Sequence, residues 1–375
     1  MLVISAQRLD DSELARENIP IGSKRSLIGP IVHSPPAGES SATRQSGAFD
    51  ALGRVTAMSV PRKILIDTDP GIDDAMAIFY ALASPELDVV GLTTVFGNAA
   101  TETCTANALR LLEIADRTDI AVARGAERPL AMAFRGPADF VHGKDGQGDV
   151  FLPPPSTSAI AGDAAHLIID TVMASPGEIT LVPIGPLTNI ALAMLLEPRL
   201  TQHLAGIVLM GGAAFVPGNA SPAAEANILN DPEAADIVFG ADCPIAMCGL
   251  DVTEKTLMSR AALARLSTAP NQRARHIAKI MPFYANFYRD RAGLDGIFVH
   301  DSTAISYLLA PQHFTTVAHP IRVDTAHGVG RGKTWPAMRV ADHESAWRGR
   351  RDVTICVGVD ADAVVALELD RLTST

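Results

Sequence analysis

The sequence contains few cysteines, no long apolar run and no cluster of basic residues. Its four cysteines, at positions 104, 243, 248 and 356, form no CxxC pair and no metal-binding spacing with histidine, so we expect reduced, buried thiols and no disulfide framework. No apolar stretch approaches the ~18 to 20 residues of a membrane span, and the N-terminus lacks the charged region and apolar core of a secretory signal. We therefore expect a cytoplasmic protein that does not contact a membrane.

Positively charged residues are also fewer than negatively charged ones. The 31 lysines and arginines are outnumbered by 42 aspartates and glutamates, which gives a formal net charge of −11. A surface that binds nucleic acid should instead show clustered lysine and arginine side chains. The composition thus argues against a nucleic-acid partner and favours a small neutral or cationic ligand.

The first 60 residues differ in composition from the rest of the chain. They contain clusters of serine, glycine and proline, such as HSPPAGESSATRQSG, and only short apolar pieces. Such a segment buries too little apolar surface to fold, so we expect residues 1–60 to be a disordered N-terminal extension. A misassigned start codon, with Met58 as the true start, is an alternative explanation.

From residue 62 onward, apolar runs of strand length alternate with segments of helical periodicity. The strand-like runs are KILID, LDVVGLTTV, EITLVPI, GIVLM and CPIAMCGLDV, and the helical segments are one from about residue 73, TCTANALRLLEIA, LTNIALAMLL, DPEAADIVF and residues 271–291. This alternation predicts an α/β fold, with one large domain over residues 61–375 and a mostly parallel central sheet flanked by helices. We expect VTICVGVD and AVVALEL to form a smaller, β-containing closure of the same domain.

Polar residues follow these apolar runs in a consistent way. Four aspartates come after KILI, Gly97-Asn98 comes after LTTV, and polar or glycine-rich loops follow the two later runs EITLVP and GIVLM. Ligands of open α/β sheets bind beyond the carboxyl ends of the strands. We therefore expect these loops to meet at one edge of the sheet and to form a site there.

The stretch DTDPGIDD places Asp67, Asp69, Asp73 and Asp74 within eight residues. Asp73 and Asp74 alone have an ordinary explanation, since aspartate is favoured at helix N-termini. That explanation does not account for Asp67 and Asp69, which lie at the end of a predicted strand. Several carboxylates that converge in a partly dry site either share protons or hold a hard cation, and oxygen ligands are those that Ca²⁺ accepts.

DTDPGIDDA resembles the N-terminal signature of the inosine-uridine-type nucleoside hydrolases, which are calcium-dependent N-ribohydrolases. Further motifs recur in the order and approximate spacing of that family: Gly97-Asn98, HGKDGQGD at 142–149, IGPLTN at 184–189, MGG at 210–212, GNASPAAEAN at 218–227 and HDS at 300–302. The resemblance covers residues 62 to 310 through these motifs and the remainder by continuity. It implies the nucleoside hydrolase fold and hydrolysis of ribonucleosides to free base and ribose in purine or pyrimidine salvage.

The resemblance also implies a set of metal ligands. Asp69, Asp74, Asp301 and the backbone carbonyl of Ile184 would bind Ca²⁺, with ribose hydroxyls and a water molecule completing the coordination. Asp69 would be the general base that activates this water, and Asp67 would support the ligands from behind.

The other residues that the resemblance implies would contact the nucleoside. Asp73 would accept a hydrogen bond from the ribose 2′-OH, and the remaining sugar contacts would come from Asn98, Asn219, Glu225 and Asn227. Cleavage of an N-glycosidic bond builds positive charge on the ribose, so a carboxylate-rich pocket favours the transition state over the neutral substrate.

Two histidines and two tyrosines are candidates for the base-binding side of the site. His300, next to Asp301 in HDS, is the candidate acid for the departing base. His142 would contribute on the other side of the base, although its glycine-rich loop could equally be a lid or a plain turn. An aromatic stripe on a helix is more often core than pocket. Tyr284 and Tyr288, however, lie at a spacing from Asp301 like that of base-contacting tyrosines in purine-accepting relatives, so both interpretations stay open.

Where the sequence departs from the family, specificity stays open. Ala226 stands where the family often has phenylalanine, and Trp335 and Trp347 lie outside the matching motifs. The preference for purine or pyrimidine bases is therefore not determined by the sequence. Family members are commonly dimers or tetramers, and we expect a homo-oligomer here.

Two other functions compete with the hydrolase. IDTD after a strand also resembles the DxD motif of haloacid-dehalogenase-like phosphatases, which use Mg²⁺, but the later GNASPAAEAN and HDS do not fit that family. A nucleoside-binding protein that lost catalysis is the other alternative. The presence of every expected metal ligand and of Asp69 argues against it.

Overall fold

The computed structural model describes residues 60–343 and 345–374. In this part of the chain, eight strands form one sheet in the order β3-β2-β1-β4-β5-β6-β12-β9, and only β9 runs antiparallel to its neighbour. The strands are β1 Arg62–Thr68, β2 Leu87–Thr94, β3 Val122–Arg124, β4 Thr180–Pro183, β5 Gly206–Met210, β6 Ile245–Cys248, β9 Phe314–His319 and β12 Val353–Val359. The predicted α/β class with a mostly parallel sheet is confirmed.

Two small antiparallel pairs accompany this sheet, β7 Leu257–Ser259 with β8 Gly296–Phe298 and β10 Ile321–Val323 with β11 Thr334–Pro336. The helices are α1 Ile72–Leu82, α2 Thr101–Ile114, α3 Asp139–His142, α4 Ala164–Ala174, α5 Thr188–Leu196, α6 Leu200–His203, α7 Ala226–Asn230, α8 Pro232–Val238, α9 Leu250–Thr253, α10 Arg260–Thr268, α11 Gln272–Ala292, α12 His300–Leu309, α13 Val340–His343 and α14 Ala361–Thr373. Within the described ranges, no helix is both long enough and apolar enough to cross a membrane.

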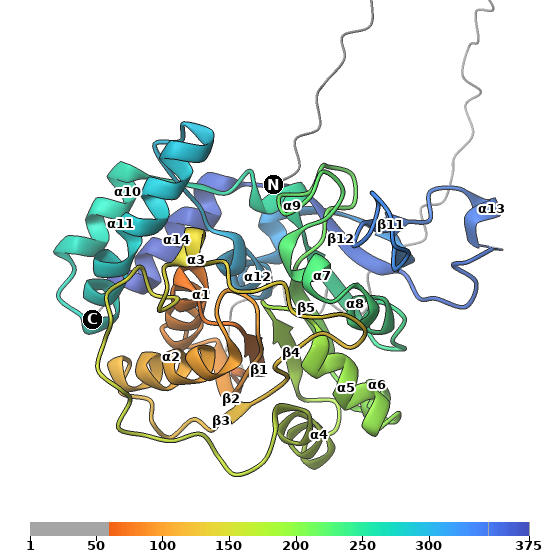
Figure 1. Cartoon of the computed structure of the whole chain (residues 1–375), viewed down its shortest axis with the longest axis horizontal. Helices are drawn as coiled ribbons and strands as arrows, with labels where there is room; N and C mark the ends of the chain where they lie inside the picture. Colours follow the sequence, from red (N-terminus) through yellow and green to blue (C-terminus); the bar gives the residue numbers. More distant parts are fainter. Residues whose placement is uncertain (1–59, 344, 375) are drawn as a thin grey trace, which may run out of the picture. The chain divides into compact units, whose positions relative to one another are not determined.

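Helices cover both faces of the sheet (Figure 1). Helices α4, α5 and α8 pack in one hydrophobic cluster that includes Ile168 together with Leu65 and Leu209 from the strands. Because side chains alternate along a strand, the neighbours Ile66 and Val208 point to the opposite face, where α1 and α12 pack. Burial on both faces explains why the strands read as continuous apolar runs in the sequence.

The chain changes direction across the sheet between β1 and β4. From β1 it runs outward through β2 and β3, then returns to the other side of β1 for β4, β5 and β6. The backbone N–H of Ile184 donates to the carbonyl of Asp67 at 2.8 Å, so the loops after β4 and β1 begin side by side. Such a topological switch point is where open α/β sheets bind ligands.

Several local predictions can be compared with the structure. The helix predicted over 271–291 is α11, and Asp231 caps α8 by accepting from Ala234 N at 3.1 Å, as the DPE sequence indicates. The C-terminal prediction is only partly right. VTICVGV is strand β12 of the main sheet, but AVVALEL lies in helix α14, which buries Val364, Val365 and Leu369 at helical spacing.

The predicted strand CPIAMCGLDV also ends earlier than expected. Its residues 249–252 leave the sheet and enter the short helix α9, with Gly249 as the N-cap. The four cysteines are free and buried, as predicted. The predicted disorder over residues 1–60 falls on residues 1–59, which lie outside the described residues, and the domain boundary at residue 61 stays a prediction.

Candidate active site

The aspartates of DTDPGIDD lie at the carboxyl end of β1 and in the first turn of α1. Asp74 is fully buried, and its carboxylate accepts hydrogen bonds from Thr68 Oγ1 at 2.5 Å, from the backbone N–H of Gly71 at 2.9 Å and from Asn98 Nδ2 at 2.8 Å. Gly71 is the N-cap of α1, so Asp74 does stabilise the start of the helix. The capping interpretation is thus correct for Asp74, and the same carboxylate also faces the other aspartates.

Asp69 occupies a slot between two glycine-containing loops. Its Oδ2 accepts from the backbone N–H of Asn98 at 2.7 Å, while its Oδ1 is buried without a hydrogen-bond partner. A Cβ atom at Gly97 would lie 1.9 Å from Asp69 Oδ2, and one at Gly185 would lie 2.5 Å from Oδ1. The glycines of the GN and IGP motifs therefore leave the space that this carboxylate fills.

Asp67 lies deeper, at the end of β1, where its Oδ1 accepts from Thr93 Oγ1 at 2.5 Å and from Asn189 Nδ2 at 2.8 Å. Asn189 also donates to the carbonyl of Thr94 at 3.0 Å and thereby ties β2 to the IGPLTN loop. Asp67 contacts these structural donors, which is the supporting position that the sequence predicts for it.

Asp301 comes from a distant part of the chain, the first turn of α12, and reaches the same place. One carboxylate oxygen from each of Asp73, Asp74 and Asp301 lies within 4.8 Å of the others, and all three residues are buried. Such a group of carboxylates could hold a metal ion. The sequence analysis names Asp69 together with Asp74 and Asp301, whereas the close group in the structure contains Asp73 instead. Asn98 connects Asp69 to this group, because it donates hydrogen bonds to both Asp69 and Asp74.

The electrostatics of this cluster are unfavourable without a cation. Burial, followed by the charge of Asp74, raises the pKa of Asp69 well above its usual range, and burial raises the pKa of Asp73 and of Asp74 to about 6. Burial and then the charge of Asp73 raise the pKa of Asp301. Asp73 Oδ1 lies 3.8 Å from His142 Nδ1, a contact that is an ion pair only when the imidazole is protonated.

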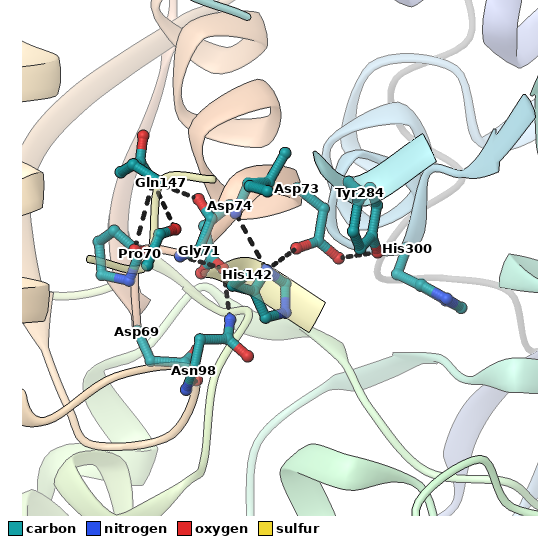
Figure 2. A network of polar contacts seen from close by, with 12 residues as sticks. Asp69, Pro70, Gly71, Asp73, Asp74, Asn98, His142, Gln147, Tyr284 and His300 are labelled. Carbon is teal, nitrogen blue, oxygen red and sulfur yellow. Dashed lines mark hydrogen bonds and ion pairs between the residues drawn. The ribbon is translucent and has the colours of Figure 1, made fainter. Parts of the chain in front are cut away.

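His142 and Tyr284 lie beside the carboxylate of Asp73, and His300 lies beyond Tyr284 (Figure 2). Tyr284 OH donates to Asp73 Oδ2 at 2.9 Å, and Tyr288 OH lies 2.8 Å from His300 Nε2. The two tyrosine hydroxyls are 3.3 Å apart, so a continuous chain of hydrogen bonds runs from Asp73 to His300. The aromatic stripe on α11 is therefore buried and hydrogen-bonded to Asp73 and His300, and its contact with a base stays a prediction.

His142 and His300 are both buried, and burial lowers the pKa of each to about 4. His142 stacks on Tyr284 with ring centroids 5.5 Å apart, and its Nδ1 accepts from the backbone N–H of Ile72 at 3.2 Å. His300 Nδ1 lies 2.8 Å from Thr253 Oγ1. Both imidazoles are thus held in fixed orientations, and His142 lies beside Asp73.

The remaining predicted residues lie on the β4 and β5 side. The carbonyl of Ile184 accepts from Asn227 Nδ2 at 3.0 Å, and both oxygens of the buried Glu225 carboxylate accept from backbone N–H groups at the start of α7 and at Gly212. Asn219 is exposed, and its Oδ1 accepts from the N–H of Ala226 at 3.1 Å. In the structure Glu225 is thus the N-cap of α7, and Asn219 forms a hydrogen bond across the loop between β5 and α7.

The sequence analysis assigned no role to several polar residues that contact this site. Thr68 binds Asp74, Thr253 binds His300, and Asn189 binds Asp67. Asn189 belongs to the IGPLTN motif, which could have identified it. Thr68 and Thr253 have no such signal, since isolated threonines beside strands and helices are common.

Comparisons with known proteins agree with this geometry. The family model described as inosine-uridine preferring nucleoside hydrolase matches residues 64–366. A probable uridine nucleosidase 2 of Arabidopsis thaliana is 44% identical over 314 residues, which is 83% of this chain and 97% of that protein. The pyrimidine-specific ribonucleoside hydrolase RihA of Salmonella gallinarum is 40% identical over 316 residues, or 84% of this chain and 99% of that protein.

A solved structure of a plant nucleoside hydrolase, the PpNRh1 enzyme, superposes with a TM-score of 0.82 at 39% identity and covers 84% of this chain and all of that one. The predicted nucleoside hydrolase fold is therefore confirmed, and the matches favour the hydrolase over the phosphatase and the non-catalytic alternative. This chain belongs to the inosine-uridine preferring nucleoside hydrolase family, and its enzymatic class is that of the nucleoside N-ribohydrolases.

Proposed function

We propose that the protein hydrolyses uridine and related ribonucleosides to ribose and free base, with Ca²⁺ held among its buried aspartates, in nucleoside salvage. The observation that carries the proposal is the cluster of buried carboxylates, in which oxygens of Asp73, Asp74 and Asp301 lie within 4.8 Å of one another. Asn98 donates to both Asp69 and Asp74, and His142 lies 3.8 Å from Asp73. Nucleosides are more suitable substrates than nucleotides, because a phosphate would face repulsion from these carboxylates.

The donor set suits a hard cation such as Ca²⁺. Asp69, Asp74, Asp301 and the carbonyl of Ile184 would hold it, and all of these ligand atoms are oxygens, which Ca²⁺ prefers. The buried Oδ1 atoms of Asp69 and Asp73 have no hydrogen-bond partner, so they are left to a cation or to substrate. Ile184 O accepts one hydrogen bond from Asn227, and a carbonyl oxygen has a second lone pair for a ligand. When bound, the ion supplies positive charge that orients the ribose diol and acidifies a neighbouring water molecule.

Asp69 is the proposed general base. Asn98 N–H fixes its Oδ2, and its free Oδ1 takes the proton from the attacking water. Asp73, held by Tyr284 through Oδ2, presents Oδ1 to the 2′-OH of the ribose. Asn98 and Asn227 lie at the edge of the carboxylate cluster and bind further sugar hydroxyls, and Asn219 and Glu225 bind the sugar from the loop between β5 and α7. The clamped sugar loses little further freedom on reaction.

Positive charge that develops on the ribose is stabilised by the surrounding carboxylates more than the neutral substrate is. His300 is the proposed donor of a proton to the departing base; Thr253 and Tyr288 lie within hydrogen-bond distance of its two ring nitrogens and fix the orientation of the imidazole. His142, which stacks on Tyr284, is the second proposed contact to the base. Tyr284 and Tyr288 complete the base-binding surface.

One experiment separates this proposal from its competitors. Released reducing sugar is measured from uridine, cytidine and inosine, with and without a calcium chelator, for wild-type protein and Asp69→Asn. We expect sugar release that the chelator abolishes and that Asp69→Asn lowers by about 10²-fold or more. Phosphate release from monophosphates without free ribose would instead support a phosphatase, and binding without release would support a non-catalytic protein.

The roles of the two histidines can be separated by the leaving group. His300→Ala should lower kcat on uridine by about 10² to 10⁴-fold. The same variant should lose much less on 4-nitrophenyl riboside, whose leaving group needs no proton. Equal losses on both substrates would assign His300 to binding, and a selective loss in His142→Ala would transfer the acid role to His142.

Three further expectations have their own measurements. The names of the uridine nucleosidase and pyrimidine-specific relatives support a higher kcat/KM for uridine than for inosine on one preparation. A homodimer or homotetramer should appear in light scattering of the purified protein. A cytoplasmic location should appear in fractionation of cells that express the full chain.

A further inference from the structure

Gln147 is a buried polar side chain in the loop between α3 and α4, next to the carboxylate cluster but outside it. It is only 3% exposed. Its amide Nε2 lies 2.7 Å from the carbonyl of Gly71, 3.1 Å from that of Gly146 and 3.4 Å from that of Pro70 (Figure 2). A buried amide that donates to the backbone of the DPG turn therefore comes from the same loop that carries His142.

The orientation of this amide is fixed by a second buried residue, His276 of α11. His276 Nε2 lies 3.0 Å from Gln147 Oε1, and the ring packs edge-on against Phe79. An amide oxygen only accepts, so Nε2 carries the hydrogen and donates it. Burial lowers the pKa of His276 to about 4, and the ring is neutral at pH 7.

The loop that carries Gln147 is held in shape by hydrogen bonds among its own residues. The carboxylate of Asp145 accepts from the backbone N–H groups of Gln147, Asp149 and Phe151 at 2.6 to 2.9 Å. Asn107 of α2 donates from Nδ2 to the carbonyls of Pro70 and Asp145, at 3.1 and 2.9 Å. The amides of Gln147 and Asn107 therefore hold the turn and the loop together from two sides.

The turn that receives these hydrogen bonds lies between the catalytic aspartates. Pro70 and Gly71 follow Asp69 directly, and Gly71 N–H donates to Asp74 Oδ2. A rotation of the peptide at Gly71 would move this N–H away from Asp74 and would displace Asp69 on its other side. The next residue, Ile72, donates its N–H to His142 Nδ1. The same turn thus connects the carboxylates with the histidine loop.

We propose that Gln147, oriented by His276, is a positioning residue that fixes the Pro70–Gly71 turn and so holds Asp69 and Asp74 ready for the cation and His142 against the base. This inference rests on the proposed function. An amide is the required group, because its N–H atoms satisfy carbonyl oxygens. A carboxylate of the same shape would place negative oxygens against Gly71 O and near an already acidic cluster.

The test compares Gln147→Glu with a matched control. Gln147→Glu changes one amide to a carboxylate at nearly constant volume. Asn271→Asp makes the same chemical change at the start of α11, where Asn271 Nδ2 donates to the carbonyls of Leu372 and Ser374, away from the site. For each protein, Ca²⁺ affinity is measured by calorimetry after chelator treatment, and kcat and KM for uridine are measured at saturating Ca²⁺.

We expect Gln147→Glu to weaken Ca²⁺ binding by about 10- to 100-fold, the usual effect of losing a group that orients a metal ligand, and to lower kcat more than it raises KM. Asn271→Asp should lower the melting temperature and leave both quantities within about twofold of wild type. His276→Phe keeps an aromatic ring against Phe79 but removes the donor to Gln147. It should weaken Ca²⁺ binding in the same direction by a smaller factor, and it keeps the test valid if Gln147→Glu does not fold.

Two outcomes would overturn the inference, and they can be told apart. If Gln147→Glu and His276→Phe melt earlier but bind Ca²⁺ and turn over uridine as wild type does, Gln147 is only structural. Wild-type protein that binds no Ca²⁺ would instead overturn the proposed function, and this inference with it.

Discussion

The carboxylate cluster predicts that a single neutral substitution will have opposite effects on stability with and without calcium. In Asp301→Asn, one charge is removed from a group in which carboxylate oxygens of Asp73, Asp74 and Asp301 lie within 4.8 Å of one another. The amide has nearly the same shape as the carboxylate, so packing against α1 is kept. The change therefore tests the charge of Asp301.

The expected size follows from the separation. Two unit charges 4.8 Å apart interact by about 3 kcal/mol at the effective dielectric constant of ~20 that suits such sites. Proton uptake relieves part of this repulsion, because the pKa of Asp301 is raised well above its usual range. Without calcium at pH 8, we therefore expect Asp301→Asn to be more stable than wild type by about 1 to 3 kcal/mol, which is several degrees in melting temperature.

With calcium the order should reverse. A ligand at 1,000 times its Kd stabilises the folded state by about 4.1 kcal/mol, and wild type should gain this while Asp301→Asn gains little. Differential scanning calorimetry at pH 8, in chelator and in excess Ca²⁺, gives all four melting temperatures. Asp170→Asn, an exposed residue of α4, is the control for a change in net charge and should stay within about 0.5 kcal/mol of wild type. A variant that is less stable than wild type in chelator, or that shifts equally with Ca²⁺, would refute the reasoning.

Three other predictions concern parts of the fold outside the cluster. Burial raises the pKa of Glu368 to about 8 from 4.5, so its contribution to stability is complete below pH 4.5 and is lost as the pH rises toward 8. Glu368→Gln, which keeps an acceptor for Ser302 Oγ, should gain on wild type as the pH rises from about 5 to 9, by a few kcal/mol at most, in urea titrations at each pH. Asp231→Ala removes the cap of α8 and two further hydrogen bonds, from Leu130 N and Thr188 Oγ1. It should lower the free energy of unfolding by about 2 kcal/mol or more in the same assay. A decrease of less than about 0.5 kcal/mol would contradict the capping role. Leu209→Ala in the buried strand β5 should cost about 2 to 5 kcal/mol, whereas Leu195→Ala on an exposed side chain should cost less than about 0.5 kcal/mol; equal effects would contradict the burial of Leu209.

The sequence predicts the parts of this protein in which local pattern and tertiary context agree. Strands β1 and β5 read as apolar runs because both of their faces are buried, and Asp231 precedes a helix that begins with proline. The aspartates of DTDPGIDD were identifiable because their number at a strand end exceeds what a helix cap needs. These features are encoded within a few residues of one another.

Other features depend on contacts that no local pattern encodes. AVVALEL is apolar at nearly every position, which fits a strand as well as the buried side of α14. Gln147 and His276 are ordinary polar residues in the sequence, and their hydrogen bond exists only because α11 packs beside the loop of α3. The exposed position of Asn219 likewise depends on the path of the loop between β5 and α7.

The origin of Asp301 in α12 has a consequence for the way in which a newly made chain matures. Strands β1 to β6 precede α12 in the sequence, so a growing polypeptide can form most of the sheet before its last carboxylate leaves the ribosome. A chain that ends before α12, or in which α12 packs incorrectly, keeps Asp73 and Asp74 but lacks the carboxylate of Asp301 at this place. Under the proposed metal binding, only molecules in which α12 has docked would present the complete group of carboxylates to an ion.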